Sequence, residues 1–382
     1  MAADANRPTF YEFFAGGGMA RAGLGEGWRC LFANDFDATK AASYRANWGE
    51  GDMRVGDIHG LNVADMPGSP DLAWASFPCQ DLSLAGNGAG LKGARSGAFW
   101  GFQRIIEGLN AQGRAPKLLV IENVIGALTS NGGADFADLT RALAALGYVV
   151  GALTIDAAHF LPQSRPRLFI LCARDEIAGA ASGEPAAPWH SPALVRAVAG
   201  LPREAQRHWR WWSLPAPTSH NMRLADLIEE APADAPWHTR AQTERFISLM
   251  SPANLRKLEA AKGAGVRMVG TIYRRTRLDE NGAKVQRAEV RFDGVAGCLR
   301  TPGGGSSRQF VMVVDGALVR TRLLSGREAA RLMGLPDEYI LPARYNDAYH
   351  LLGDGLAVSA VRFLREHLLD ALVGSAPVQA AA

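Results

Sequence analysis

The sequence predicts an α/β fold, and three observations in its first sixty residues indicate that class. Apolar segments alternate with segments of helical periodicity from residue 8 onward. A glycine-rich turn at 14–18 separates the first apolar segment from the first helical one. The second apolar segment ends near Asp35, at the distance expected for the second strand of a βαβ unit.

The elements follow in a regular order along the chain. We expect strands at 8–14, 28–33, 71–76, 117–121 and 168–172, with helices at 19–25 and 38–47 between the first of them. Asp57 would close a further strand. Glycines at 16–18 permit positive φ and close backbone approach, and the amides of the helix that follows can face a ligand.

This layout favours an adenosine-type ligand at the ends of the strands. Asp35 can accept both hydroxyls of a ribose, and Asp57 lies at the same predicted edge. A nicotinamide-dependent dehydrogenase would use a similar arrangement. Alternatively, both aspartates act only as helix caps, and no ligand is needed to explain them.

Composition narrows the class of protein. The chain has 382 residues, of which 48% are hydrophobic and 21% charged, as in globular proteins of two or three domains. Four cysteines without CxxC spacing argue against a disulfide framework and against a zinc site. We therefore expect a protein that binds no metal and is located in the reducing cytoplasm. No apolar run approaches the length of about 20 residues that crosses a bilayer, and the first residues lack a signal pattern.

Cys79 is the candidate nucleophile. It follows Pro78 at the end of the strand expected at 71–76, where a loop can present a thiolate, and Gln80 comes next. The other cysteines lie in apolar or glycine-containing segments and are expected to be packing residues: Cys30, Cys172 and Cys298.

Two further motifs carry charge at the ends of predicted strands. Glu122 follows the apolar run 117–121, which places a carboxylate at the C-terminal end of that strand. Arg165 and Arg167 precede the apolar strand 168–172, where guanidinium groups need anionic or carbonyl partners. Structural salt bridges would explain either motif alone, but their combination with Pro78-Cys79 favours a reaction centre.

Positive charge gathers between residues 201 and 300. This region holds 17 lysines and arginines against 11 acidic residues, although the whole chain carries only +3. The densest part is 262–291, and the cluster His208-Trp209-Arg210-Trp211-Trp212 precedes it. Basic residues interleaved with aromatic ones are typical of nucleic-acid binding, whereas a solvated surface over core tryptophans is the alternative.

Taken in order, these motifs resemble those of the DNA cytosine-5 methyltransferases. The matching segments are Phe14-Ala15-Gly16-Gly17-Gly18, Phe77-Pro78-Cys79-Gln80, Glu122-Asn123-Val124, Gln163-x-Arg165-x-Arg167, 322–336 and 349–358. The resemblance implies a Rossmann-like, S-adenosylmethionine-dependent methyltransferase sheet with helices on both faces, plus a smaller mixed target-recognition domain. We expect a catalytic domain at 1–179, target recognition at 180–300, with a linker at 180–202, and a return to the catalytic domain at 301–382. The last helix would pack near the first strand.

The family also implies a mechanism and the residues that perform it. A cytosine flips out of duplex DNA, Cys79 adds to its C6, S-adenosylmethionine methylates C5, and elimination frees the enzyme. Glu122 would hold N3 and the exocyclic amine and Arg167 the O2 oxygen, while Arg165 would support the site or the thiolate. Pro78 and Gln80 complete the catalytic set. The expected cofactor site comprises Phe14, Ala15, Gly16, Gly17, Gly18, Asp35, Phe36, Asp57, Ile58, Asp354 and Gly355.

Duplex DNA is the expected partner. The glycine-rich segment 83–96 fits a catalytic loop, and the basic region fits the variable target-recognition segment of the family. The expected DNA contacts are Ser83, Lys92, Arg95, Arg308 and, as a group, Arg267, Arg274, Arg275 and Arg277. We further expect a cytoplasmic monomer without membrane contact, and a cognate restriction endonuclease related by function rather than by binding.

The sequence departs from the family pattern at three places, and three alternative functions stay open. Ser76 stands where glycine is common, Glu12 where aspartate is frequent, and Asp354-Gly355 where asparagine and a small residue are usual. An RNA methyltransferase acting on transfer RNA would keep the same centre, but a basic region of roughly 120 residues favours duplex DNA. A silent DNA-binding homologue and a dehydrogenase are the other two alternatives.

Overall fold

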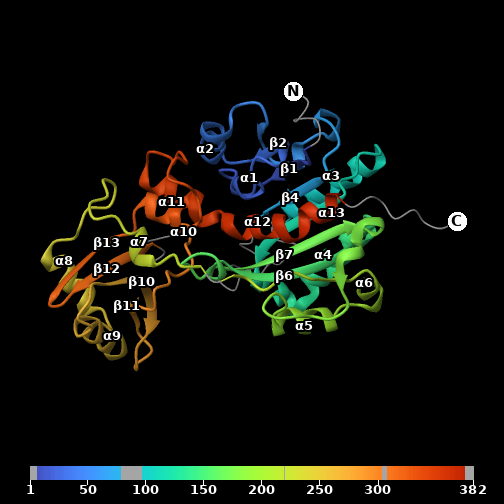
Figure 1. Cartoon of the computed structure of the whole chain (residues 1–382). Helices are drawn as coiled ribbons and strands as arrows, with labels where there is room; N and C mark the ends of the chain where they lie inside the picture. The colour runs from blue at the N-terminus through green and yellow to red at the C-terminus, as the bar shows by residue number, and fades with distance from the viewer. Residues whose placement is uncertain (1–6, 79–96, 219, 303–307, 375–382) are drawn as a thin grey trace. The chain divides into compact units, whose positions relative to one another are not determined.

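The computed structural model describes residues 7–78, 97–218, 220–302 and 308–374, which belong to two compact units. Within the described residues, the first unit contains 7–156, 166–217 and 360–374, and the second contains 157–165 and 218–359. Figure 1 shows the elements of both units.

The first unit is built on a seven-stranded sheet in the order β3-β2-β1-β4-β5-β7-β6. The pairs among β1 to β5 are parallel, and β7 is antiparallel to both β5 and β6. The strands are β1 (Thr9–Phe13), β2 (Arg29–Asp35), β3 (Met53–Val55), β4 (Leu72–Ala75), β5 (Leu118–Val124), β6 (Tyr148–Asp156) and β7 (Pro166–Arg174). The predicted α/β class is therefore confirmed.

Helices between the strands make the parallel crossovers possible. They are α1 (Met19–Leu24), α2 (Ala38–Trp48), α3 (Ala98–Ala111) and α4 (Ala134–Ala145), with short 3₁₀ turns at Ile58–Gly60 and Val63–Asp65. One core contains Phe13 of β1, Ile121 of β5, Phe102 of α3 and Leu143 of α4. Because side chains alternate along a strand, the neighbouring positions, such as Glu12 and Glu122, lie on the opposite face of the sheet.

The segment expected to be a linker, 180–202, packs on the first unit instead, so that expectation is wrong. It contains α5 (Pro192–Ala199), whose first turn is capped by the hydroxyl of Ser191. Trp189 and Leu194 are buried. The expected boundaries at 179/180 and 300/301 accordingly differ from the edges of the compact units, at 217/218 and 359/360. Alanine and proline richness indicated a linker, but burial of these apolar side chains stabilises an ordered segment.

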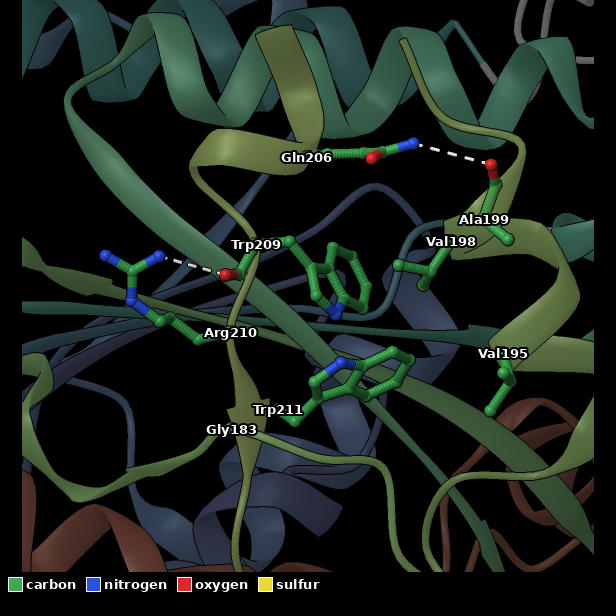
Figure 2. Close-up of a pocket in the computed structure, with 8 residues that line it drawn as sticks. All are labelled: Gly183, Val195, Val198, Ala199, Gln206, Trp209, Arg210 and Trp211. Atoms are coloured by element: carbon green, nitrogen blue, oxygen red, sulfur yellow. Dashed lines mark hydrogen bonds between the residues drawn. The ribbon is translucent and has the colours of Figure 1, made fainter. Parts of the chain in front are cut away.

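The tryptophan-rich cluster also belongs to the first unit. Trp212, in β9 (Trp211–Trp212), is fully buried, and its Nε1 donates to the carbonyl of Leu171 at 3.1 Å. Trp209 is buried against Phe136, after α6 (Arg203–Arg207). Trp209 and Trp211 line a pocket of about 500 Å³. Figure 2 shows both indole rings. Packing in the core, rather than nucleic-acid binding, therefore explains Trp209 and Trp212.

The second unit contains a four-stranded antiparallel sheet in the order β11-β10-β12-β13. Its strands are β10 (Met268–Leu278), β11 (Lys284–Arg291), β12 (Gln309–Asp315) and β13 (Leu318–Leu323). Its helices are α7 (Leu224–Leu227), α8 (Arg240–Ser248), α9 (Pro252–Lys262), α10 (Gly326–Leu332) and α11 (Tyr345–Asp354). Phe246 of α8 and Leu258 of α9 pack on Ile272 and Phe310 to form its core.

The chain re-enters the first unit within α12 (Val358–Leu364). A π-helical turn at Arg365–Leu369 leads into α13 (Asp370–Gly374). Nε1 of Trp28 donates to Asp370 at 2.7 Å, and Arg365 donates to the carbonyl of Leu24 at 3.1 Å. These bonds fix the last helices beside α1 and the start of β2. Among the described residues, no helix combines the length and apolarity that a membrane span requires.

Candidate active site

The glycine turn after β1 lies against the end of β2. Because the two strands are parallel, their carboxyl ends meet at one edge of the sheet. The amide of Gly16 donates to the Asp35 carboxylate at 2.8 Å, so the structure brings these two predicted cofactor residues together. Phe14 and Gly16 both have positive φ, and a Cβ on Gly16 would meet nothing within 4 Å. The turn is therefore open above Gly16.

Gly18 is needed for close packing against Trp48, whereas Gly16 borders open space. It has φ +79°, and a Cβ there would lie 2.8 Å from Cδ1 of Trp48. The indole Nε1 of Trp48 donates to the carbonyl of Gly17 at 3.0 Å. A side chain at position 18 would therefore push α1 away from α2, which explains why this position of the turn needs glycine.

Asp35 and Phe36 have contrasting environments. Asp35 is buried, its second carboxylate oxygen accepts from the amide of Asp37 at 2.8 Å, and burial raises its pKa above the ordinary value. Phe36, the next residue, is 78% exposed, so its ring is accessible to a ligand. Asp57 caps the short turn that follows it by accepting from His59 at 2.9 Å, while Ile58 lies in the core.

Glu122 and Arg167 form an ion pair across the β5–β7 ladder. Glu122 pairs with Phe169 and Val124 with Arg167, so Glu122 and Arg167 are diagonal neighbours on one face. Nε of Arg167 lies 3.0 Å from Oε1 of Glu122, and both side chains are largely buried. The structure thus brings together two of the predicted catalytic groups. Because the ion pair is largely withdrawn from water, both charges act in a medium of low polarity.

The chain approaching Cys79 is tied to the same strand. Nδ2 of Asn123, next to Glu122, donates to the carbonyl of Phe77 at 3.3 Å. Phe77 is buried and Pro78 exposed, so the backbone emerges from the core at this point. The other predicted site residues of this segment lie outside the described residues: Cys79, Gln80, Ser83, Lys92 and Arg95.

Ser76, the departure from the usual glycine, has a local partner. Trp74 lies two residues earlier, in β4, and is fully buried. Its indole Nε1 donates to Oγ of Ser76 at 3.1 Å. A buried donor without an acceptor is costly, so the serine compensates for the tryptophan just before Phe77 and Pro78.

Arg165 lies in the second unit, where it binds backbone carbonyls. Its guanidinium donates to the carbonyls of Leu299 and Gly353 at 2.9 Å, and also to that of Gly355. A further bond reaches Sγ of Cys298 at 3.4 Å. Arg165 thereby holds the loop on either side of Asp354, which is exposed and forms the end of α11. These bonds give the arginine a positioning role for the predicted cofactor segment.

The structure reveals a buried carboxyl group, Glu12, that the sequence motifs did not identify as a candidate site residue. Glu12, in β1, accepts hydrogen bonds from the amides of Ala20 and Arg21 in the first turn of α1. Burial raises its pKa to about 8, and the positive charge of Arg21 opposes that rise only in part. Arg21 itself pairs with Asp52 at 2.9 Å and donates to Tyr44. In the sequence, an acidic residue inside the apolar strand TFYEF is the signal that could have identified this buried carboxyl group.

Two of the buried cysteines, Cys30 and Cys172, are ill suited to nucleophilic attack at neutral pH. Burial raises the pKa of Cys30 to about 12 and raises that of Cys172 still further. Both thiols therefore stay protonated, as the sequence analysis expected of packing residues.

The basic region does not present its four arginines on one surface. Arg275 and Arg277 lie on one face of β10, where Glu289 pairs with them at 3.4 and 2.5 Å. Arg274 lies on the other face. Arg267 pairs with Glu230 at 2.5 Å, and Arg308 donates to Asn346 at 2.6 Å.

Comparison with known proteins gives a match along almost the whole chain. Residues 8–370 match the family model described as C-5 cytosine-specific DNA methylase. The Type II methyltransferase M.HpaII of Haemophilus parainfluenzae is 26% identical over 382 residues, which cover 95% of this chain and 90% of that protein.

Solved structures agree on the fold. The crystal structure of the S. pombe Dnmt2 methyltransferase has a TM-score of 0.57 at 18% identity and covers 96% of this chain and 98% of its own. The Entamoeba histolytica methyltransferase EhMeth has a TM-score of 0.61 at 14% identity and covers 96% and 99% respectively.

Proposed function

This chain belongs to the C-5 cytosine-specific DNA methylase family, and on that premise we propose that it methylates C5 of cytosine in duplex DNA. The observation that carries the proposal is the ion pair between Glu122 and Arg167. The pair lies at the end of β5, and Asn123 links that strand to the backbone leading into Cys79.

The chemistry assigns a separate task to each of these groups. C5 of cytosine is a weak nucleophile, and addition of the Cys79 thiolate to C6 would make it enamine-like. Glu122 would hold N3 and the exocyclic amine and share a proton with N3 as negative charge develops on the ring. Arg167 would bind the O2 oxygen while its contact with Glu122 keeps the carboxylate oriented. Loss of the C5 proton and elimination would then free Cys79.

The first unit offers groups that fit S-adenosylmethionine, which supplies the methyl group when bound. Each Asp35 oxygen accepts one backbone amide, and a carboxylate has lone pairs for two further donors, as the ribose hydroxyls require. The exposed ring of Phe36 can stack on an adenine. Open space above Gly16 leaves room for the ligand at the backbone. Asp354 and Gly355, held through Arg165, belong to the proposed site on the resemblance alone.

Duplex DNA is favoured over transfer RNA by the basic residues of the second unit between 262 and 291 and by the names of the relatives. M.HpaII is named a Type II methyltransferase. We therefore propose duplex DNA as the substrate, and a role beside a cognate restriction endonuclease that recognises the same sequence. A silent DNA-binding homologue is disfavoured by the intact Glu122–Arg167 pair.

The decisive experiment is transfer of tritiated methyl from S-adenosylmethionine to unmethylated duplex DNA, followed by digestion to nucleosides. Total transfer RNA is offered in a parallel reaction. We expect label in 5-methylcytosine from the DNA, and none above background with Cys79→Ala. Cys30→Ala is the matched control, because its buried thiol has a pKa of about 12 and takes no part in the chemistry.

Each contrary result removes a specific part of the proposal. Label in transfer RNA but not in DNA would replace the substrate and keep the reaction. Equal labelling by Cys79→Ala and wild type would remove Cys79 as the nucleophile. Folded protein that binds DNA without transferring label would indicate the silent homologue.

A further inference from the structure

The main sheet carries a pocket beside its last strand, apart from the groups of the proposed reaction. The order of the strands places β7, β5 and β4 between β6 and β1, whose end leads into the glycine turn. Along β6, Ile155 pairs with Arg167, whereas Trp209, which lines the pocket, bridges to Val150. The pocket volume of about 500 Å³ lies in the range typical of small-molecule sites, about 300 to 1,000 Å³. The pocket is thus large enough for a ligand and separate from the cofactor turn.

Close approach of the chain to the edge strand builds this pocket. The amide of Val150 donates to the carbonyl of His208, and the amide of Arg210 donates back to the carbonyl of Val150, both at 2.8 Å. A Cβ on Gly151 would collide with the carbonyl of Arg210, so glycine at this position permits the approach. The backbone on either side of Trp209 is therefore fixed to the sheet.

Two indole rings and one helix form the walls. Trp209 packs on Phe136 with ring centroids 5.8 Å apart and meets Trp211 at 5.5 Å, where the two indole planes are inclined by 74°. His190 holds the Trp211 ring in turn, with centroids 4.8 Å apart. The facing wall in Figure 2 is aliphatic and belongs to α5: Val195, Val198 and Ala199. A slot with fixed aromatic rings on one side and aliphatic groups on the other suits a flat ring.

The indole Nε1 of Trp209 is a hydrogen-bond donor in this wall. It is buried and has no hydrogen-bond partner among the described residues. Figure 2 shows it on the edge of the ring that faces Trp211, but an aromatic face is only a weak acceptor. Six other indoles donate to oxygen acceptors of the protein: Trp28, Trp48, Trp74, Trp189, Trp212 and Trp237. Since an unpaired buried donor is costly, an acceptor supplied by a ligand would stabilise this position.

The polar side chains at the rim are engaged with backbone carbonyls. Nε2 of Gln206 donates to the carbonyl of Leu201 at 2.7 Å, and Arg210 donates to that of Trp209 at 2.9 Å. Figure 2 shows the guanidinium of Arg210 extending away from the two indoles. Among the described residues that line the pocket there is no carboxylate. A neutral ligand therefore fits this pocket better than an ionic one.

We infer that this pocket binds a small, neutral, planar heteroaromatic molecule, whose ring lies between the indoles and α5 and whose acceptor atom receives the hydrogen bond of Trp209 Nε1. The ring supplies the apolar contact, and the acceptor pairs the buried donor of the wall. A ring of the same shape without an acceptor binds more weakly. The site is separate from the proposed reaction, so it holds whether or not the chain methylates DNA.

Titration with two ligands of the same shape tests this assignment. Benzimidazole has a ring nitrogen that accepts a hydrogen bond, whereas indole has no such acceptor, and both are neutral at slightly alkaline pH. The readout is the set of indole Nε1–H resonances of the whole chain labelled with ¹⁵N-tryptophan, in which Trp209→Phe and Trp211→Phe identify two of the nine tryptophans. We expect benzimidazole to shift the Trp209 resonance with a dissociation constant of about 1 mM, and indole to bind about tenfold more weakly.

Three variants locate the ligand. Trp209→Phe keeps a ring against Phe136 and removes the donor, so the two ligands should bind alike, as followed at the Trp211 resonance. Ala199→Phe fills the pocket from an exposed position of α5 and should abolish the shift of Trp209. Arg196→Phe adds the same ring at an exposed position of that helix outside the pocket. It is the matched control and should bind benzimidazole as the wild type does.

Each contrary result overturns a stated part of the inference. Absence of a saturable shift of Trp209 up to about 10 mM benzimidazole would overturn the site. Equal affinities of the two ligands for the wild type would overturn the role of the Nε1 donor, and an undiminished shift in Ala199→Phe would place the ligand elsewhere. If Trp209→Phe does not fold, the comparison of Ala199→Phe with Arg196→Phe decides, because both substitutions are at exposed positions. Methyl transfer is not the readout, so none of these results bears on the proposed DNA substrate.

Discussion

The buried Glu12 carboxyl should make the stability of the first unit depend on pH. Its pKa in the folded chain is about 8, against an ordinary value of 4.5. A group whose folded pKa is raised stabilises the protein fully below its unfolded pKa, and this contribution is lost as pH rises through the folded value. Between about pH 5 and about pH 8 this contribution to the free energy of unfolding falls by about 3 to 4 kcal/mol.

Glu12→Gln is the informative substitution because an amide resembles the protonated acid. Its carbonyl can still accept from the amides of Ala20 and Arg21, yet it cannot ionise in the unfolded chain. We expect the unfolding free energy of Glu12→Gln, relative to wild type, to rise by about 3 to 4 kcal/mol over that pH range. The effects of all other titrating groups cancel in the comparison.

Urea unfolding followed by tryptophan fluorescence and circular dichroism at a series of pH values measures this difference. Glu26→Gln, at an exposed position, is the control for the replacement of a carboxylate by an amide. A difference between Glu12→Gln and wild type that stays constant across the range would refute the argument, because Glu12 would then titrate alike in the folded and unfolded chains.

Two further substitutions test how the site is supported. Gly18→Ala should lower the unfolding free energy by about 3 kcal/mol, because it combines a positive φ with a clash against Trp48. Gly16→Ala, with open space around it, should lower it by about 1 kcal/mol. Equal effects of the two substitutions in urea unfolding would contradict the packing argument. Ser76→Ala should cost about 1 to 2 kcal/mol by leaving the buried indole of Trp74 without its acceptor, while Ser76→Thr should retain most of the stability. Wild-type stability of Ser76→Ala would show that the bond contributes nothing.

Local sequence patterns were sufficient to predict the first strands and helices of the parallel part of the main sheet. Alternating apolar and helical segments predicted β1, α1, β2 and α2 to within about two residues, because βαβ units impose a strong local pattern. The proximity of Gly16 and Asp35 followed from the same pattern, since parallel strands end at one edge.

Composition was a poorer guide where burial decides the structure. Alanine and proline predicted a linker at 180–202, but Trp189 and Leu194 anchor that segment in the first unit. The tryptophan-rich cluster was grouped with the basic region, yet Trp212 is completely buried. A list of residue types does not reveal which side chains have apolar neighbours, because those neighbours come from distant parts of the chain.

The sequence by itself determined the family, the order of the motifs and the identity of the candidate groups, because the chemistry requires those residue types at the ends of particular strands. Only the tertiary structure decided how those groups are used. It joined Glu122 to Arg167 across an antiparallel ladder, directed Arg165 to backbone carbonyls, and separated Arg274 from Arg275 onto opposite faces of one strand. Strand register and burial set these relations, and both depend on contacts between residues far apart in the chain.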